Sequence, residues 1–355
     1  MFYLPNAAID VIKIFTLGAI SFLVAFWFTP FLINFLYKYK LWRKEVRHKA
    51  IDGKDLTYFQ KFHSEGETQV PRLGGLLIWV VPLILAIVFF FLSKIDIWWL
   101  HKLNFLSRGQ TWLPFFALIS AALLGLVDDI LQIRGKGKYI GGGLGLKKRL
   151  LMMGLIGLIG GWWFFAKLDV STLHIPGVGD LGIGILYIPL FIFVTMAAYS
   201  GGVIDGLDGL AGGAFASMFA AFAGIALFRG QIDLAAFCIV ILGAILAFLW
   251  SNIPPARFYM GETGVMGLTA ALTVVAFLTD SVLVLPIIGF LLVFESGSVI
   301  LQLLSKKFRR KKIFLAAPIH HHFEAKGWPH YKITMRFWII GVIAAIIGVA
   351  IRLLG

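Results

Sequence analysis

Residues 232–250 read IDLAAFCIVILGAILAFLW, a run with only one charged side chain. An α-helix needs about 20 mostly apolar residues to cross the hydrocarbon core of a bilayer. Hydrophobic residues make up 59% of the 355-residue chain and charged residues only 14%, against about 25% charged in soluble domains. Because a soluble fold could not bury so much apolar surface, the sequence predicts an all-α polytopic membrane protein.

Ten runs of this kind occur along the chain, and each predicts one transmembrane helix. They lie at 11–37, 73–93, 111–131, 150–167, 183–200, 209–228, 232–250, 263–279, 282–305 and 334–354. The single cysteine, Cys238, lies in an apolar run and is expected to be buried. No sequence repeat divides the chain, so residues 1–355 are expected to form a single integral membrane domain.

The basic residues are unevenly distributed, and their positions predict an orientation. The net charge is +14, and 25 of the 32 lysines and arginines lie in the segments 38–72, 132–149, 251–262 and 306–336. With ten spans these segments share one side, which the positive-inside rule makes cytoplasmic, so both termini are expected in the periplasm. This distribution explains the positive charge without a nucleic-acid partner.

Two adjacent carboxylates, Asp128 and Asp129, close the third predicted span. Carboxylates at the end of an apolar helix repel each other and lose hydration, and a cation such as Mg²⁺ relieves the repulsion. Acidic groups at such positions are functional candidates by default. The alternative is a solvated pair that keeps this end of the helix at the membrane surface.

The second and third candidate motifs are loops. Residues 205–213 read DGLDGLAGG, where Asp205 and Asp208 share one face of a helical turn and the glycines let a ligand approach. Capping of the next helix is the alternative role. Residues 252–264 read NIPPARFYMGETG and combine an amide, a guanidinium, a ring and a carboxylate, which suits a nucleotide and a metal. The alternative is a turn that leaves Glu262 at a helix N-terminus.

Three consecutive histidines, His320, His321 and His322, form the fourth motif. Neighbouring side chains on a helix diverge by about 100°, so a zinc site is not expected. Imidazoles beside a basic run can donate to a phosphate or a sugar. The alternative is an interfacial loop on anionic lipid. All four motifs fall on the predicted cytoplasmic face, which favours phosphoryl transfer from a soluble nucleotide to a lipid over an ion carrier.

These motifs resemble those of the polyprenyl-phosphate N-acetylhexosamine-1-phosphate transferases, and within them the phospho-N-acetylmuramoyl-pentapeptide transferase branch (translocase I). The family pattern has an Asp-Asp pair, a DGLDGLA loop, an N-x-x-P-A-x-x-F-M-G-D loop and a P-x-H-H-H-F-E motif. The matches here are Asp128-Asp129, 205–211, 252–262 and 318–324. The HHHFE motif followed by Gly327-Trp328 favours this branch over relatives that use simpler UDP-sugars.

The resemblance implies a reaction at the inner leaflet of the bacterial cytoplasmic membrane. UDP-N-acetylmuramoyl-pentapeptide meets undecaprenyl phosphate, and phospho-sugar passes to the lipid phosphate with Mg²⁺ as cofactor. The products are lipid I and UMP, and the step is the first membrane step of peptidoglycan synthesis. Relatives also pair as dimers, so a homodimer is one expectation.

The resemblance also suggests roles for individual residues. Asp128, Asp129 and Asp205 are the candidate catalytic residues, and Asp128 accepts the proton of the lipid phosphate or holds that phosphate in position. Glu262 binds Mg²⁺ with help from Asp205 or Asp129. The candidate substrate contacts are Asp208, Asn252 and Tyr259 for uridine, Lys136, Lys147, Lys148 and Arg149 for phosphates, and His320, His321 and His322 for the sugar or lipid phosphate. Direct attack and a two-step route through an aspartyl phosphate both fit.

Six positions depart from the family pattern. P-T-M-G-G reads Pro71-Arg72-Leu73-Gly74-Gly75, two expected lysines are Glu67 and Gln132, an expected Asn is Gly202, and the metal-binding Asp is Glu262. Glu67 and Gly202 leave open a relative that uses another UDP-N-acetylhexosamine. Gln132 and Glu262 leave open a non-catalytic homologue that binds lipid phosphate.

Overall fold

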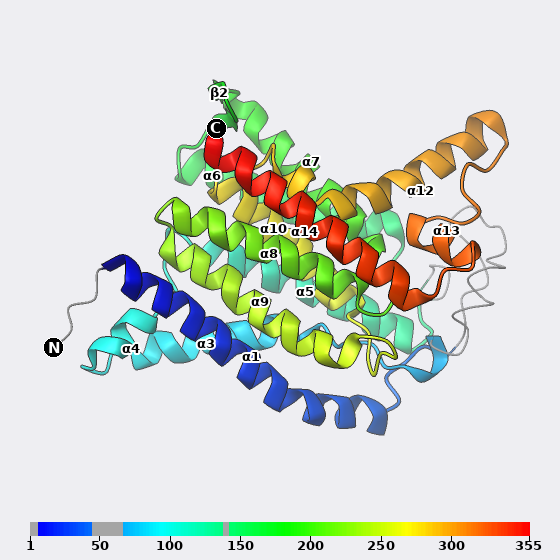
Figure 1. The fold of residues 1–355 in the computed structure, drawn as a ribbon, viewed down its shortest axis with the longest axis horizontal. Coiled ribbons are helices and arrows are strands. Elements are labelled where there is room, and N and C mark those ends of the chain that lie inside the picture. The colour runs from blue at the N-terminus through cyan, green and yellow to red at the C-terminus, as the bar shows by residue number, and fades with distance from the viewer. Residues whose placement is uncertain (1–5, 45–66, 138–141) are drawn as a thin grey trace.

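The computed structural model describes residues 6–44, 67–137 and 142–355. Its long helices lie side by side between two ends of the molecule (Figure 1). The described helices are α1 (Asn6–Lys38), α3 (Leu76–Leu92), α4 (Trp98–Leu103), α5 (Trp112–Ile133), α6 (Leu146–Lys167), α7 (Tyr187–Ser200), α8 (Leu210–Phe228), α9 (Ile232–Asn252), α10 (Gly261–Leu278), α11 (Leu285–Ile288), α12 (Phe290–Arg309), α13 (Ile319–Ala325) and α14 (His330–Leu354). Two strands, β1 (Thr172–Ile175) and β2 (Gly179–Gly182), and two 3-10 turns, η1 (Gly184–Leu186) and η2 (Gly201–Ile204), accompany them.

Eight helical segments within the described residues are long and apolar enough to cross a membrane. They are Ala7–Lys38, Trp112–Ile133, Leu146–Lys167, Gly184–Ile204, Leu210–Phe228, Ile232–Asn252, Gly261–Leu278 and His330–Leu354. These segments confirm a multi-pass, mainly helical membrane protein. Two further spans were predicted. The span 73–93 corresponds to α3, which has 17 residues. The span 282–305 corresponds to α11 together with α12, and α12 carries Glu295 and ends in a basic turn.

The predicted span 282–305 is interrupted rather than continuous. α11 ends at Ile288, α12 begins at Phe290, and Gly289 between them has φ −89° and ψ 27°. Glycine favours such a break because it loses more backbone freedom in a helix than any other residue. The new helix direction carries α12 away from the other helices towards the right of Figure 1.

A two-stranded antiparallel hairpin, β1 with β2, is the one described departure from an all-helical chain. It follows α6 at a point where the sequence predicts only a loop. Gly177 and Gly179 have φ of +76° and +110° at the reversal. Residues with a Cβ rarely adopt these angles, so the two glycines permit the tight return.

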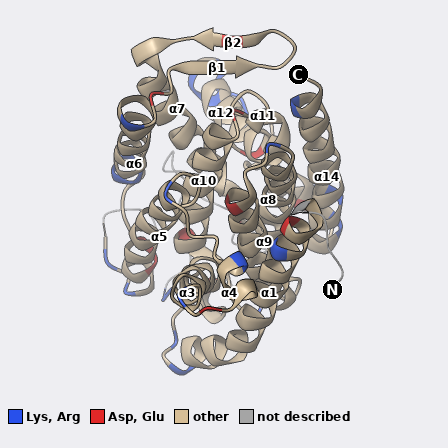
Figure 2. Ribbon diagram, turned by 90° about the vertical axis from the view of Figure 1, so that its left-hand side faces the viewer, with Lys and Arg blue, Asp and Glu red and all other residues tan. Residues whose placement is uncertain are grey.

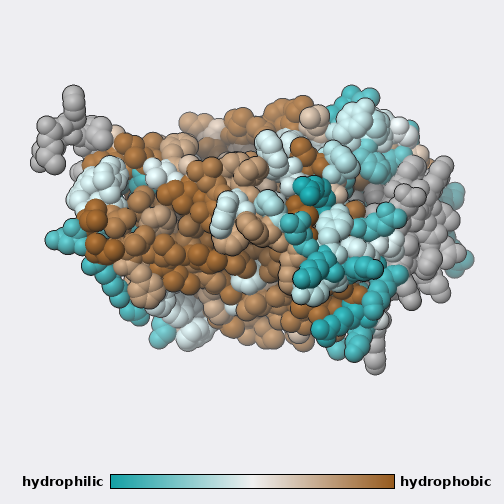
Figure 3. Space-filling model, turned by 90° about the horizontal axis from the view of Figure 1, so that it is seen from below, coloured by the Kyte–Doolittle hydropathy of each residue, from teal (hydrophilic) through white to brown (hydrophobic). Residues whose placement is uncertain are grey.

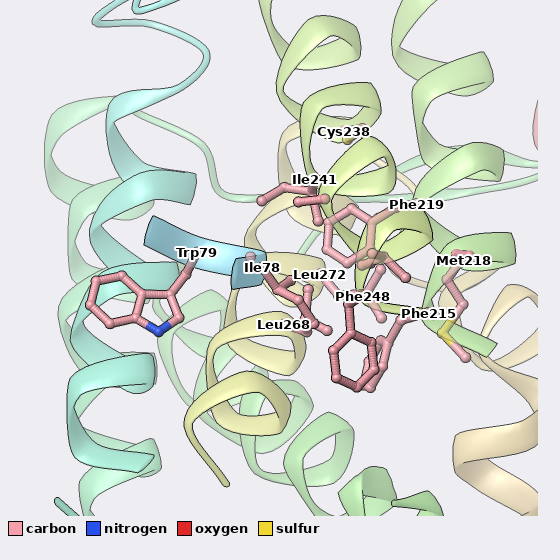
Figure 4. Close-up of a cluster of buried hydrophobic side chains, with 14 of the residues drawn as sticks. Ile78, Trp79, Phe215, Met218, Phe219, Cys238, Ile241, Phe248, Leu268 and Leu272 are labelled. Carbon is pink, nitrogen blue, oxygen red and sulfur yellow. The ribbon is translucent and has the colours of Figure 1, made fainter. Parts of the chain in front are cut away.

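The most deeply buried side chains belong to α8, α9 and α10. α9 packs against both α1 and α8, and α10 packs against α5. In Figure 4, Ile78 of α3 lies beside Leu268 and Leu272 of α10, with Phe248 of α9 close by. Cys238 is fully buried, as predicted. Close packing at this centre fixes the helix ends relative to one another.

The two ends of the bundle differ in composition. α1 begins and α14 ends on the left of Figure 1, whereas α13 and the C-terminus of α12 lie on the right. Most of the ribbon is tan, without charge, when it is viewed from the left (Figure 2). In Figure 3, hydrophobic brown covers the middle of the surface and hydrophilic teal gathers towards the right-hand end. The end that holds α13 and residues 306–312 is called the polar end below.

Candidate active site

Asp128 and Asp129 lie in the last two turns of α5, at the polar end, and both side chains are fully buried. The interpretation as a solvated pair is therefore wrong. Asp128 accepts hydrogen bonds from Gln132 Nε2 at 2.6 Å and from the backbone N–H of Leu144. Arg149 Nη1 lies 3.5 Å from Oδ2 of the same carboxylate. Every one of these partners is a donor, so the pocket is built for a carboxylate.

Asp129 follows Asp128 in α5, and successive side chains of a helix diverge by about 100°. Its carboxylate therefore faces a different neighbour, the N-terminus of α10. The Thr263 N–H donates to its Oδ2 at 2.9 Å, and Arg72 Nε lies 3.4 Å from its Oδ1. A Cβ at Gly125 would overlap the carbonyl oxygen of Glu262, so only glycine allows α5 to approach α10 this closely. Gly125 thereby places Asp129 at a helix N-terminus, where free N–H groups favour an anion.

Glu262 lies in the first turn of α10. Its Oε1 is paired with Nη1 of Arg149, and the Tyr199 hydroxyl donates to its Oε2 at 3.4 Å. Arg149 therefore lies between Glu262 and Asp128, two carboxylates from different helices. Its side chain is only 8% exposed. A guanidinium with little access to water stabilises both acids far more than an exposed lysine would.

Asp205 follows η2, and its Oδ2 accepts a hydrogen bond from the Gly261 N–H at 3.3 Å. Gly261 has φ +75°, and a Cβ there would press on the Asp129 carboxylate. Glycine at this position therefore lets Asp205 and Asp129 approach the same backbone segment. Burial raises the pKa of the Asp205 carboxyl to about 6, while Arg72 opposes this shift and Glu262 adds to it.

Asn252 joins the two predicted motif loops. Its Oδ1 accepts from the Gly209 N–H at 3.0 Å, and its Nδ2 donates to the Phe258 carbonyl at 2.9 Å. Asp208 Oδ2 accepts from the Ala256 N–H at 3.0 Å, which adds a second link. Among the described residues no side-chain hydrogen bond caps the start of α8, whose N-cap residue is Gly209, so the capping role for the aspartates is wrong. The contacts of Asn252 and Asp208 thus hold the two loops together.

Tyr259 is partly buried, and its backbone is hydrogen-bonded to a third loop, residues 71–74. Its N–H donates to the Pro71 carbonyl at 2.8 Å, and its carbonyl accepts from the Gly74 N–H at 2.8 Å. This pairing places Arg72 beside Asp129. The departure from the family pattern at Arg72 therefore supplies a cation to the acidic cluster.

His320 lies beside His321, with ring centroids 4.2 Å apart, but it bonds to a different carboxylate. It is fully buried, and its Nδ1 lies 2.9 Å from Oε2 of Glu295, which is also fully buried. Its Nε2 has no hydrogen-bond partner in the described part of the chain and faces Gly206. His320 therefore connects α12 with the loop that carries Asp205. Glu295 gave no signal in the sequence because it lies alone in an apolar run.

His321 and His322 have separate partners, as the helical geometry predicts. His321 Nδ1 lies 2.5 Å from Oε2 of Glu324. His322 Nδ1 accepts from the Leu315 N–H at 3.1 Å, and burial together with Lys326 lowers the pKa of His322. The three rings do not converge on one point.

Lys136 and Lys148 are exposed, and within the described residues neither side chain makes a hydrogen bond or an ion pair. The basic residues at 47, 49, 54, 61 and 138 lie outside the described residues. Within the described ranges, the cations that contact the acids are Arg72 and Arg149. Sequence reasoning grouped Arg149 with the neighbouring lysines and treated Arg72 only as a departure from the family pattern.

The acidic cluster consists of Asp128, Asp129, Asp205 and Glu262, and among the described residues two guanidinium groups, those of Arg72 and Arg149, lie among these four carboxylates. The described carboxylates outnumber the described cations, and their donor atoms are all oxygens, which fits a divalent cation such as Mg²⁺. No group of three or more His, Cys, Asp or Glu side chains is placed to hold a metal ion within the described chain. Mg²⁺ often needs only one or two carboxylates, because water and substrate phosphates complete its shell.

Comparison with known proteins agrees with this chemistry. The model of glycosyl transferase family 4 matches residues 111–280. The phospho-N-acetylmuramoyl-pentapeptide-transferase of Anoxybacillus flavithermus is 33% identical over 96% of this chain and 97% of its own length. Those of Geobacillus thermodenitrificans and Lactiplantibacillus plantarum are 34% and 35% identical over 94% and 93% of this chain and 96% and 95% of their own lengths. The chain belongs to the phospho-N-acetylmuramoyl-pentapeptide-transferase family.

Proposed function

We propose that the protein transfers phospho-N-acetylmuramoyl-pentapeptide from its UDP-linked form to undecaprenyl phosphate, giving lipid I and UMP. The observation that carries the proposal is the acidic cluster at the polar end, with Arg72 and Arg149 among its carboxylates. Similarity along nearly the whole chain to phospho-N-acetylmuramoyl-pentapeptide-transferases supports UDP-N-acetylmuramoyl-pentapeptide as the donor substrate. Phosphoryl transfer requires positioned charges rather than covalent protein chemistry, and this cluster offers them.

Asp128 is the proposed proton acceptor. Gln132, Leu144 and Arg149 hold its carboxylate in one orientation. Asp128 takes the proton of the lipid phosphate, whose freed oxygen attacks the sugar-bound phosphorus while the bond to UMP breaks. Arg149 lies within reach of the same region and counters the negative charge of the phosphates. A route through an aspartyl phosphate stays a prediction.

Glu262 and Asp205 would hold Mg²⁺, with Asp129 close to both. A bound Mg²⁺ supplies positive charge to the diphosphate and to the departing UMP. Burial raises the pKa of the Asp205 carboxyl to about 6, and a cation bound beside it would favour the ionised form.

The substrate contacts are proposed from the same arrangement. Asp208, Asn252 and Tyr259 are the candidates for uridine, and Asn252 keeps one amide N–H and one lone pair beyond the two hydrogen bonds that it makes to the loops. Lys136 and Lys148 are exposed cations for incoming phosphates. His321 and His322, which are partly exposed, are the candidates for the sugar phosphate or the lipid phosphate.

Membrane placement completes the proposal. The polar end faces the cytoplasm of a bacterial cell, α3 and α11–α12 add two spans to the eight apolar ones, and both termini lie in the periplasm. The basic segment 306–312 at the polar end supports this orientation. The homodimer implied by the family resemblance stays a prediction.

Cysteine labelling tests the orientation. Val178 is 81% exposed in the hairpin, and Lys312 is exposed at the polar end. In intact cells an impermeant thiol reagent is expected to modify Val178→Cys, and to modify Lys312→Cys only after permeabilisation. The parent protein is a suitable background because Cys238 is fully buried. Reaction of Lys312→Cys in intact cells would show that the orientation or the span number is wrong.

Glu262→Asp tests the proposed metal ligand. The carboxylate would retract by about 1.5 Å, the length of one backbone-type bond, and would leave Arg149. Mg²⁺ binds its ligands at about 2.0–2.1 Å, so we expect a higher Mg²⁺ concentration for half-maximal UMP release. An unchanged rate with an unchanged Mg²⁺ requirement would remove Glu262 from the metal site and leave Asp205 and the Asp pair.

The choice of donor is tested by supplying the purified protein with Mg²⁺, undecaprenyl phosphate and one UDP-sugar at a time. We expect UMP release with UDP-N-acetylmuramoyl-pentapeptide and little with UDP-N-acetylglucosamine. The reverse preference would show that the protein is a related transferase with another donor. Binding of undecaprenyl phosphate without UMP release from any donor would favour a non-catalytic homologue.

A further inference from the structure

Arg43, which follows α1, contacts Glu67 and Gln132 among the residues that the structure describes. Its Nη1 lies 3.0 Å from Oε1 of Glu67, and its Nη2 donates to Oε1 of Gln132. All three residues are buried, with exposed fractions of 5%, 7% and 4%. Gln132 in turn donates to Asp128. Four buried polar side chains therefore form a continuous path from Glu67 to the proposed proton acceptor.

The chemistry of the groups fixes the direction of every hydrogen bond along this path. A guanidinium can only donate, so the Gln132 amide must turn its oxygen towards Arg43. Its nitrogen is then left to face Asp128, where it donates to Oδ2 at 2.6 Å. The opposite amide orientation would place nitrogen against a donor and oxygen against a carboxylate. Arg43 thus determines which atom Gln132 presents to Asp128.

We propose that Arg43 is a positioning residue for Asp128, acting through the amide orientation of Gln132, and that Glu67 holds Arg43 in place for this task. The inference deepens the proposed function and rests on it, because Asp128 is the proton acceptor only if the protein is a transferase. Arg43 itself contacts no carboxylate of the acidic cluster among the contacts that the structure describes.

Two departures from the family pattern find a common explanation in this path. Glu67 and Gln132 stand where lysines are expected, and both contact the same guanidinium. A lysine at either position would bring a second cation against Arg43 at a buried site, which is strongly unfavourable. The three residues are therefore matched to one another, and a lysine at position 67 or 132 should reduce stability.

A charge exchange separates a positioning role from a purely structural ion pair. Arg43→Glu alone should lower both the unfolding temperature and kcat, since two carboxylates would then face each other. The double variant Arg43→Glu with Glu67→Lys restores an ion pair and should recover the unfolding temperature. Its kcat should stay low, by about 10²-fold, which is the typical penalty for a misplaced group. The reason is that the carboxylate of the introduced Glu can only accept hydrogen bonds, so the Gln132 amide turns its nitrogen towards this carboxylate. The Gln132 oxygen then faces the Asp128 carboxylate.

Two further variants complete the experiment. Arg43→Lys remains a donor, and it should keep most of kcat with KM values close to those of the parent protein. Lys44→Glu makes the same charge change at the exposed neighbouring residue, and it should leave kcat and unfolding temperature unchanged. UMP release and thermal unfolding are measured for every variant in the full-length protein.

The outcomes separate the inference from the function on which it rests. Recovery of kcat together with stability in the double variant would overturn the positioning role. Unchanged kcat in Arg43→Glu, or a loss in Arg43→Lys as large as in Arg43→Glu, would do the same. Absence of UMP release from the parent protein would overturn the proposed function and this inference with it.

Discussion

Asp128→Asn is expected to lower the rate of UMP release by at least about 10²-fold, the lower scale of a general acid–base contribution. Gln132, Leu144 and Arg149 all donate towards this carboxylate. In the asparagine, an NH₂ group replaces one accepting oxygen and faces a hydrogen-bond donor. The amide side chain also cannot take up a proton at neutral pH. The loss should appear in kcat, because the substrates are bound by other groups.

The control for this variant is Asp96→Asn, the same change at an exposed carboxylate between α3 and α4. It should leave turnover unchanged. Thermal unfolding of both variants shows whether the protein remains folded. Near-normal turnover in Asp128→Asn would exclude Asp128 as the proton acceptor and would leave Asp129 and Asp205 as the candidates.

Arg149→Met should produce the second large effect. The guanidinium lies between Asp128 and Glu262, and its side chain is 8% exposed. Its removal takes away the cation that contacts both carboxylates and leaves them to repel each other. Breaking a buried pair in this way costs about 3–5 kcal/mol, and we expect the lower part of this range because the Glu262 side chain is 22% exposed. UMP release should fall as well, because Asp128 loses a neighbour that holds its orientation.

Lys167→Met provides a matched comparison, since Lys167 is an exposed cation at the opposite end of the same helix. Chemical denaturation should show a clear loss of stability for Arg149→Met and almost none for Lys167→Met. Equal stability of the two variants would mean that the carboxylates do not depend on Arg149.

Much of the fold could be predicted because the signals are local. The length of an apolar run specifies a span without reference to the rest of the chain, and this succeeded for the eight apolar segments. The break at Gly289 and the β1–β2 hairpin were missed, because each depends on one or two glycines whose conformation is set by their surroundings.

The candidate site was predicted unevenly for a similar reason. Acidic residues at span ends stand out in an apolar sequence, so Asp128, Asp129 and Asp205 were found directly. Their cations were not, because Arg149 pairs with Glu262 across 113 residues and Arg72 meets Asp129 across 57. Charge alone does not tell which of 32 basic side chains is buried and which is solvated.

The mass of the lipid product tests the central claim most directly. Purified protein is incubated with Mg²⁺, undecaprenyl phosphate and UDP-N-acetylmuramoyl-pentapeptide, and the lipid fraction is analysed by mass spectrometry. The account predicts undecaprenyl phosphate enlarged by one phospho-N-acetylmuramoyl-pentapeptide, with one UMP released for each product. UMP release without a lipid-linked product, or a lipid product formed only from another UDP-sugar, would contradict it.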